Sequence, residues 1–402
     1  MPSKPLNRSL HAAKATKQDE FYTQLSDIEK ELRHYTKHFK GKTVLCNCDD
    51  PKVSNFFHYF SHNFEKLKLK KLITTCYKNC EPDLFSQYTA DSGIYLEYDG
   101  DKNNNRVPDP EEIGIHKLNG DGDFRSAECV KLLEQADIVV TNPPFSLFRE
   151  YLEQLVKHKK KFIIIGNKNA ITYKETFTLI KQNQLWVGST AMGTDMLFQV
   201  SDGLAKILVD TKKQGSAYRM VNGEIMARSQ SCWFTNLEHH KRHEELVLFK
   251  AYNPAQYPTY VNYDAIEVGK TEEIPADYAG PMGVPISFLD KYNPDQFEIL
   301  GSSRTLGRPM SEFAKKGAYL QGGPRFYLSK KAKRRVPRGL PRGGRRSLLE
   351  GFRGGMQPPL GVGPCMIWYK GWHDTEASES CGLRYLLPPG VVPEVSSANI
   401  SG

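Results

Sequence analysis

The chain has 402 residues, of which 39% are hydrophobic and 25% charged, which is enough for one large domain or two ordinary ones with real cores. No apolar run approaches the roughly 20 residues of a membrane span, and the polar N-terminus is unlike a signal peptide. The eight cysteines are scattered, which is typical of reduced intracellular thiols rather than of a disulfide framework, so we expect a cytoplasmic protein with no membrane partner.

The formal net charge of +9 is unevenly distributed along the chain. Residues 329–353 contain ten Lys and Arg residues and one acidic residue, Glu350, so they carry an excess of nine positive charges by themselves. The rest of the chain is therefore nearly neutral. A nucleic-acid ligand is compatible with that balance if the basic residues cluster on one face, but net charge alone does not establish one.

The first part of the chain alternates predicted helices and strands. Residues 1–17 are polar and lack periodicity, and we expect them to be disordered. Apolar residues recur at helical spacing from Leu25 to Tyr35 and from Phe56 to Leu67, which predicts two helices. Short apolar runs predict strands at 44–46 and 72–76, an inserted hairpin formed by 94–98 and 113–118, and, after a short helix at 128–134, a strand that ends at Thr141.

That last strand stops at Asn142-Pro143-Pro144-Phe145, because two prolines cannot continue a strand's hydrogen-bond ladder. Ser146 is a good N-cap and begins a predicted helix, and a second apolar strand follows at 162–166. The tetrapeptide therefore lies at the carboxyl end of a strand, where open α/β sheets bind ligands. We predict an α/β fold with a doubly wound, mainly parallel sheet and a functional site at this loop.

Beyond residue 185 the pattern changes to strands with long polar connections that contain proline. The predicted strands lie at 185–187, 196–200, 225–234, 246–249 and 260–268. This composition indicates an α+β or β-rich region suited to presenting loops. After Leu328 the composition changes abruptly to Arg, Gly and Pro, and we expect 329–402 to be a disordered tail, either a genuine basic tail or, as fits better, an out-of-frame C-terminus.

The tetrapeptide has a chemical use. An exocyclic amine conjugated to an aromatic ring is a poor nucleophile, because its lone pair is delocalised. The Asn142 side-chain oxygen and the Pro143 carbonyl can accept hydrogen bonds from such an amine, and the two prolines hold that carbonyl in a fixed direction. Phe145 offers a flat face on which an extruded base can stack. The alternative interpretation is an ordinary turn that ends a strand.

The loop resembles the (Asn/Asp/Ser)-Pro-Pro-(Tyr/Phe) signature of S-adenosylmethionine-dependent amino-methyltransferases. Residues 18–328 are similar to one branch of these enzymes, the EcoRI-type adenine-specific DNA methyltransferases. The resemblance rests on motifs that also follow in the order of that family, at 19–23, 44–51, 54–56, 122–126, 141–150, 166–169, 232–236, 283–286 and 291–297. It implies a Rossmann-like methyltransferase sheet and S-adenosyl-L-methionine as cofactor.

The resemblance also implies where that cofactor binds. Phe21, Tyr22 and Thr23 match the segment that closes over its methionine end. The first cofactor loop corresponds to Asp49, Asp50 and Pro51, and the loop that holds the cofactor's adenine corresponds to Asp123 and Phe124. Two features depart from the wider methyltransferase pattern: the first loop lacks the usual Gly-x-Gly, and the second strand does not end in an acidic residue for the ribose.

The implied reaction is direct, in-line methyl transfer to N6 of an adenine flipped out of duplex DNA, as in a bacterial modification system. Residues 18–184 would then be the S-adenosylmethionine-binding catalytic domain, and 185–328 the DNA target-recognition region that completes the fold. We expect a monomer, and a restriction endonuclease acting on the same site is a candidate partner. Candidate phosphate contacts are Arg219, Arg228, Lys241, Arg242 and Arg304.

Several alternatives stay open. The same chemistry could act on N6 of adenine in RNA or on a glutamine side-chain amide of a protein, and a catalytically inactive DNA-binding relative is a third possibility. We expect no metal site, because the spacings Cys46-x-Cys48 and Cys76-x₃-Cys80 are unlike those of zinc sites. The cluster from His239 to His243 lies among charged residues and is predicted to be a solvated helix face.

Overall fold

The computed structural model describes residues 21–47, 54–76, 93–105, 108–109, 111–193, 195–200, 202–212, 214–260, 263–303 and 325–331. The segments expected to be disordered, 1–17 and all but the first three residues of 329–402, lie outside these ranges. So do Cys48, Cys80 and Arg304 and the loop with Asp49, Asp50 and Pro51. Within the described residues, no helix is long and apolar enough to cross a membrane.

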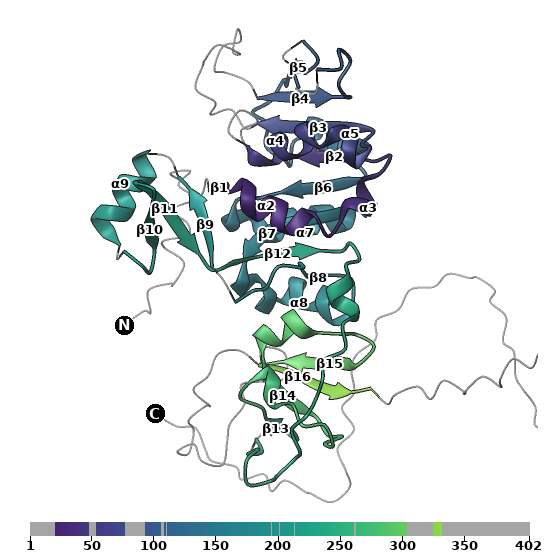
Figure 1. The fold of residues 1–402 in the computed structure, drawn as a ribbon, viewed down its shortest axis with the longest axis vertical. Coiled ribbons are helices and arrows are strands. Elements are labelled where there is room, and N and C mark those ends of the chain that lie inside the picture. Colours follow the sequence, from purple (N-terminus) through teal and green to yellow (C-terminus); the bar gives the residue numbers. More distant parts are fainter. Residues whose placement is uncertain are drawn as a thin grey trace, which may run out of the picture. The chain divides into compact units, whose positions relative to one another are not determined.

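An eight-stranded mixed sheet lies at the centre of the fold, with the strand order β5-β4-β3-β2-β6-β7-β12-β8 (Figure 1). Its four middle strands are parallel: β3 (Lys71–Cys76), β2 (Thr43–Cys46), β6 (Ile138–Thr141) and β7 (Lys161–Asn167). The outer strands β4 (Ile94–Tyr98), β5 (Gly114–Lys117), β12 (Ser231–Thr235) and β8 (Trp186–Val187) are antiparallel to their neighbours.

The expectation of a mainly parallel sheet is therefore correct only for the four middle strands. The predicted hairpin at 94–118 is confirmed as β4 and β5, which pair antiparallel to each other, and β4 also pairs antiparallel to β3. The strands β8 and β12 lie beyond residue 184, so the region after that residue contributes to the central sheet.

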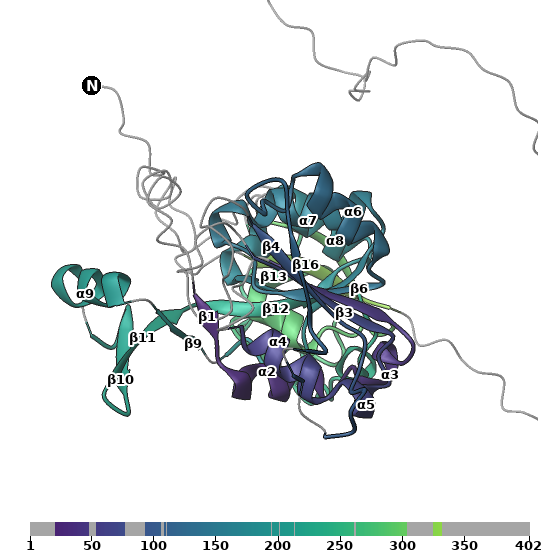
Figure 2. The same cartoon turned by 90° about the horizontal axis from the view of Figure 1, so that it is seen from above.

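Helices cover both faces of the central sheet (Figure 2). Alternate strand residues such as Leu45, Val139 and Ile164 pack into one hydrophobic core with α6 (Ala127–Gln135), α7 (Phe148–Lys157) and α8 (Lys174–Lys181). Their neighbours Val44 and Val140 pack into a second core with α2 (Leu25–Leu32), α3 (Thr36–Phe39), α4 (Asn55–His62) and α5 (Phe64–Leu67). Burial on both faces explains why these strands are continuous apolar runs.

A second, antiparallel sheet has the order β1-β9-β11-β10. It contains β1 (Tyr22–Thr23), β9 (Met196–Gln199), β10 (Tyr218–Val221) and β11 (Glu224–Ser229), and α9 (Asp202–Thr211) connects β9 to β10. The continuous strand predicted at 225–234 is wrong, because the chain changes sheets at Gln230. Residues before it form β11 of the second sheet, and residues after it form β12 of the central sheet.

A third sheet has the order β13-β14-β16-β15, with β13 (Ile266–Glu267), β14 (Met282–Pro285), β15 (Phe297–Ser302) and β16 (Arg325–Lys330). Strand β16 extends two residues into the expected tail. The strand predicted at 246–249 does not form. At its first residue the side-chain amide of Gln296 binds the backbone in place of a neighbouring strand: it donates to the Leu246 carbonyl at 2.7 Å and accepts from the Leu246 N–H at 2.9 Å. Short 3₁₀ helices connect the larger elements: η1 (Phe145–Leu147), η2 (Lys168–Thr172), η3 (His240–His243), η4 (Thr271–Glu273) and η5 (Ile286–Lys291).

Candidate active site

The Asn-Pro-Pro-Phe loop follows β6 at the carboxyl ends of the parallel strands, as predicted. The Thr141 hydroxyl donates to the backbone carbonyl of Asn47 at the end of β2, and the Tyr151 hydroxyl of α7 donates to the Asn47 side-chain oxygen. The start of the following helix differs from the prediction. A 3₁₀ turn closed by the Leu147 N–H and the Pro144 carbonyl comes first, so Ser146 is not the N-cap of α7.

Asn142 is the most constrained residue of the loop, with only 6% of its surface exposed. Its side-chain nitrogen donates to the Phe21 carbonyl at 2.6 Å. A carbonyl can only accept, so this bond fixes the orientation of the amide. The other end, Oδ1, is buried and has no hydrogen-bond partner among the described residues. A buried acceptor without a partner is costly to maintain, which marks this oxygen as a group held ready for a ligand.

Three aromatic rings meet beside Asn142. The Phe145 ring stacks on that of Phe21, with centroids 5.6 Å apart and planes inclined by 25°. Phe198 of β9 meets Phe145 edge-on at 6.1 Å. Sequence reasoning missed Phe198, since it predicted a strand at 196–200 but not what the residues of that strand would contact. Pairing of β9 with β1 brings it to the loop.

The segment from Phe21 to Thr23 lies between the Asn142 side chain and the start of α4. The Thr23 carbonyl accepts a hydrogen bond at 2.7 Å from the side chain of Asn55, the first residue of α4. Ser54 caps the same helix by accepting from the Phe57 N–H. The Thr23 side chain is only 2% exposed, and its hydroxyl oxygen finds no partner in the described part of the chain. The segment that binds the Asn142 amide therefore also contains a buried polar atom of its own.

The Asp123-Phe124 loop is fixed to α7 by a residue that sequence reasoning did not single out, Arg125. Its guanidinium binds both Asp123 oxygens, at 2.9 and 2.6 Å, and also Glu150 of α7 at 2.9 Å. This pairing lowers the pKa of the Asp123 carboxyl below its ordinary value. The Phe124 ring packs edge-on against Tyr151 at 5.0 Å. Since Tyr151 bonds Asn47, the Asp123-Phe124 loop lies next to the ends of β2 and β6.

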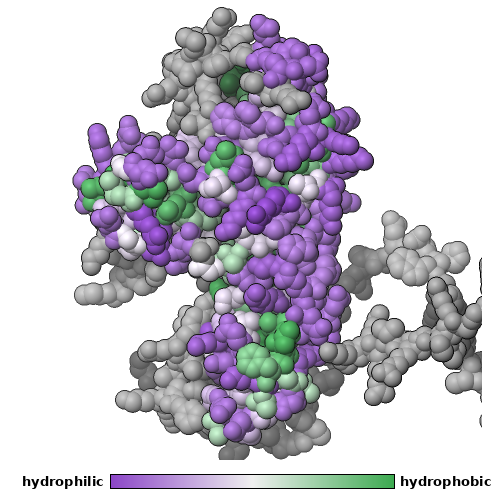
Figure 3. Space-filling view, in the orientation of Figure 1, coloured by the Kyte–Doolittle hydropathy of each residue, from purple (hydrophilic) through white to green (hydrophobic). Residues whose placement is uncertain are grey.

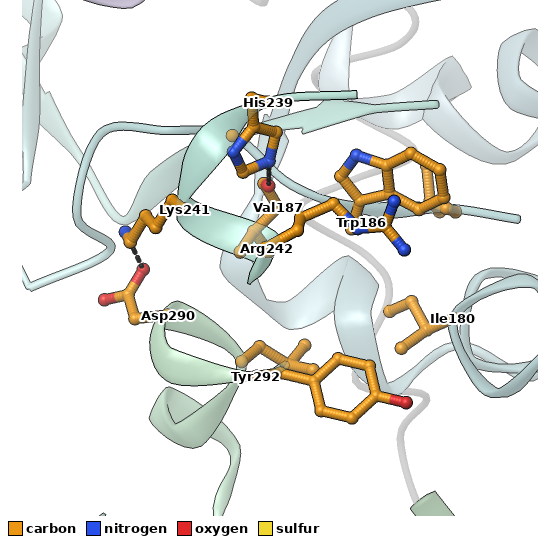
Figure 4. A pocket seen from close by; sticks show the side chains of 11 residues that line it. Ile180, Trp186, Val187, His239, Lys241, Arg242, Asp290 and Tyr292 are labelled. Carbon is orange, nitrogen blue, oxygen red and sulfur yellow. Dashed lines mark hydrogen bonds and ion pairs between the residues drawn. The ribbon is translucent and has the colours of Figure 1, made fainter. Parts of the chain in front are cut away.

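The four basic residues predicted to contact phosphates that the structure describes lie in two places, two on the second sheet and two on η3. Arg219 is exposed on β10, and Arg228 of β11 pairs with Asp195 at 2.5 Å. Lys241 and Arg242 lie on η3, which follows β12 of the central sheet. There Lys241 pairs with Asp290 at 3.3 Å (Figure 4).

Arg242 and the neighbouring histidines require a correction. The Arg242 guanidinium is stacked 3.4 Å above the Trp186 ring, is bonded to Glu238 and Asn183, and is buried, so it holds the fold together and is not placed to contact phosphate (Figure 4). The prediction of a solvated face is also wrong for His239, which is buried against the Val187 carbonyl and whose pKa burial lowers to about 4. In the described residues no group of His, Cys, Asp and Glu is arranged to hold a metal ion.

An unpaired amide oxygen beside an aromatic face, at the end of a parallel strand, fits the class of amino-methyltransferases, which act on an amine attached to a flat ring. Comparison with known proteins identifies the family of methyltransferases to which the chain belongs. The family described as adenine-specific methyltransferase EcoRI matches residues 9–334, and the chain belongs to this family. The family resemblance and the adenine-specific DNA methyltransferase class predicted from the motifs are thereby confirmed.

Three curated relatives agree with this assignment. The type II methyltransferase M.EcoRI of Escherichia coli is 49% identical over 300 residues, which cover 73% of this chain and 89% of that protein. M.MgeORF184P of Mycoplasma genitalium is 39% identical, covering 72% of this chain and 84% of the relative, and M.MpnI of Mycoplasma pneumoniae is 38% identical, covering 81% and 95%. No solved structure is significantly similar to the chain.

Proposed function

We propose that this enzyme transfers a methyl group from S-adenosyl-L-methionine to N6 of an adenine flipped out of duplex DNA, as the modification enzyme of a bacterial restriction-modification system. The observation that carries the proposal is the buried Asn142 Oδ1 without a partner. Its orientation is set by the bond from Asn142 Nδ2 to Phe21, so the amide does not have to turn over to accept from a target NH₂ that reaches the loop. The Pro143 carbonyl supplies the second acceptor.

The two acceptors act on the electrons of the target amine. A hydrogen bond to each N–H draws the nitrogen toward tetrahedral geometry and returns its lone pair from the ring. N6 is then the nucleophile in a single in-line displacement, in which the N–CH₃ bond forms as the S–CH₃ bond breaks. S-adenosyl-L-homocysteine and one N6 proton are released, and no covalent enzyme intermediate is needed. Phe145 offers a ring face to the base, and since Phe21 already covers one face of that ring, the base uses the other.

The residues near the loop fit the proposed cofactor. When bound, S-adenosylmethionine supplies an activated methyl group on sulfur. The unpaired Thr23 hydroxyl is available to its polar methionine end, and Asp123 keeps acceptor capacity beyond the bonds to Arg125 for an exocyclic amine. The Phe124 ring and the Phe21-Tyr22 segment are the other residues that we propose contact the cofactor. Because Phe21 is also bonded to Asn142, the cofactor segment and the acceptor amide are positioned together.

For DNA, we propose that Arg219 and Arg228 contact phosphates, since both belong to the sheet that brings Phe198 to the catalytic loop. Residues 18–184 bind the cofactor and carry out most of the chemistry, and the region that follows recognises the DNA target. The protein acts as a monomer. A restriction endonuclease specific for the same DNA site is the expected counterpart.

Incubation with tritiated S-adenosylmethionine and duplex DNA, RNA or protein, followed by nucleoside and amino-acid analysis, tests the substrate. We expect N6-methyladenine in the DNA only. Label in RNA adenine or in protein glutamine, with none in DNA, would replace the proposal by one of the alternatives. No label in any substrate, with cofactor still bound, would indicate an inactive DNA-binding relative.

We expect Phe145→Ala to weaken retention of the flipped base by about 1–3 kcal/mol, the usual contribution of a base stacked on an aromatic ring. A fluorescent adenine analogue at the target position should lose most of its extrahelical signal. Phe145→Trp, which keeps a flat face, is the matched control and should retain that signal. If the alanine variant fluoresces like the wild type, the base stacks elsewhere.

We expect Arg125→Met to weaken cofactor binding about tenfold, because Asp123 loses a charge-assisted fork that holds its carboxylate in place. The rate at saturating cofactor should change much less. Isothermal titration with S-adenosylmethionine measures the binding. The control is Arg149→Met on α7, since Arg149 is exposed and stacks on Tyr173 instead of binding the Asp123-Phe124 loop. Equal affinities in both variants would remove Arg125 from the cofactor site.

A further inference from the structure

The β10–β11 hairpin is a narrow, two-stranded ribbon. Its strands pair from Tyr218 and Ala227 out to Val221 and Glu224, where Asn222 and Gly223 close the turn. Both turn residues have positive φ, 51° and 87°, as a two-residue hairpin turn of the favoured twist requires. Asn and Gly tolerate this conformation, so the tip is tight and carries no bulky side chain.

The outer part of this ribbon exposes apolar side chains. Met220 is 52% and Val221 39% exposed, and Arg219 beside them is exposed as well. The adjoining helix α9, all of whose residues are described, buries none of its side chains, and its Ile207 and Val209 are exposed. Figure 3 shows apolar and hydrophilic residues interspersed over this part of the surface. Exposed apolar residues gathered on one edge strand are typical of a surface that binds a partner.

The base of the ribbon is fixed to the catalytic loop. Phe198 pairs in register with Ala227, and Ala227 with Tyr218, so the three form one row across the second sheet. Phe198 contacts both Phe145 and Phe21 of the active site. The turn lies four residues beyond that row, or about 14 Å at about 3.4 Å per residue. Figures 1 and 2 show β10 and β11 extending away from the central sheet.

We propose that the β10–β11 hairpin enters the major groove of the DNA next to the flipped adenine and reads base edges there. The groove admits a two-stranded ribbon, and its depth of about 8.5 Å is less than the reach of this one. Met220 and Val221, on opposite faces of the ribbon near its tip, contact the apolar C5 edges of pyrimidines, and Arg219 binds a phosphate at the groove wall. The inference rests on the proposed DNA substrate and adds the element that recognises it.

Duplex DNA fits this surface better than a protein partner does. The ribbon is continuous with the catalytic loop through Phe198, so whatever occupies it must lie beside the bound target base. Arg219 adds a positive charge next to the apolar residues. A second copy of the chain would explain exposed apolar residues but not their fixed distance from the reacting base.

The test compares the double variant Met220→Thr/Val221→Thr with the wild type. Threonine preserves the tendency to form a strand and removes apolar surface. Sequencing DNA methylated by the wild type first defines the recognised site. We expect the double variant to bind and methylate a duplex with that site at least about tenfold more weakly, since each lost base contact has an effect of this order. Binding to a scrambled duplex should change less than about twofold, because it depends on phosphate contacts.

Controls separate this inference from the proposed function and from misfolding. Val247→Thr removes an apolar side chain that is 79% exposed outside the second sheet, and it should behave like the wild type. Cofactor affinity should be unchanged in both variants.

If the wild type methylates DNA and the double variant does so with the same site preference and rate, the hairpin does not read DNA. If sedimentation shows that the wild type is a dimer and the double variant a monomer with unchanged DNA affinity, the surface is a protein interface and the inference fails. If the wild type methylates no DNA at all, the proposed function itself fails.

Discussion

Replacing Asn142 with alanine is expected to lower the rate of methyl transfer by about 10²–10³-fold or more, the loss that follows removal of one preorganised group from a reacting centre. The variant loses the buried oxygen that the target amine needs. Cofactor binding should persist, since Phe21, Thr23 and Asp123 remain. Single-turnover kinetics with labelled S-adenosylmethionine and duplex DNA measure the transfer, and equilibrium dialysis measures the binding.

Asn142→Asp is the informative companion variant. It keeps an acceptor oxygen but replaces the donor to the Phe21 carbonyl with a second acceptor, so the two oxygens repel each other. We expect a rate between those of the wild type and the alanine variant. An alanine variant that transfers methyl groups at the wild-type rate would exclude Asn142 from the chemistry. One that no longer binds the cofactor would show that this residue organises the cofactor site instead.

The second large effect is expected on stability, from Glu31→Ala. Glu31 is fully buried at the end of α2, where its carboxylate accepts hydrogen bonds from the Ser189 and Thr190 N–H groups at 2.7 Å each, and from the hydroxyls of Thr190 and Tyr35. Removal leaves the buried Tyr35 hydroxyl and the partly buried donors of Ser189 and Thr190 without this acceptor, so we expect the free energy of unfolding to fall by about 3–5 kcal/mol.

Gly188 shows how closely this carboxylate is surrounded, because a Cβ at that position would lie 2.3 Å from the Glu31 side chain. Urea unfolding followed by circular dichroism measures the change in stability. Glu29→Ala on the exposed side of the same helix is the matched control, and its effect should stay within about 0.5 kcal/mol. A Glu31 variant as stable as that control would mean that the loop at 188–190 finds other acceptors.

Local patterns were sufficient to predict the elements around the catalytic loop. Strands β6 and β7 are buried on both faces and therefore appear as unbroken apolar runs, and Pro143 and Pro144 fix where the first of them ends. The tetrapeptide and its chemistry could be predicted for the same reason, because strand, loop and helix are consecutive. Even there the first helical turn was mispredicted, since the propensity of Ser146 to cap a helix did not outweigh the 3₁₀ turn that begins at Phe145.

What could not be predicted depends on contacts between residues distant in sequence. Phe198 reaches Phe145 only through the pairing of β9 with β1, which no local pattern specifies. The residues around Arg242 are locally charged, but Trp186 and Asn183 come from an earlier segment and bury that side chain. At 246–249 the apolar run suits a strand, yet the backbone of Leu246 pairs with the side chain of the distant Gln296 and no strand forms.

The change of sheets at Gln230 has a mechanical consequence. The last residue of β11 and the first residue of β12 are separated by this one residue, and β12 is hydrogen-bonded to β7 along five residue pairs. A hinge needs backbone φ and ψ angles that can rotate without breaking the hydrogen bonds between strands. A single residue between two strands offers only one such pair of angles. A force applied to the β10–β11 hairpin therefore reaches β12 of the central sheet directly, and this short connection limits how far the second sheet can move independently of the central sheet.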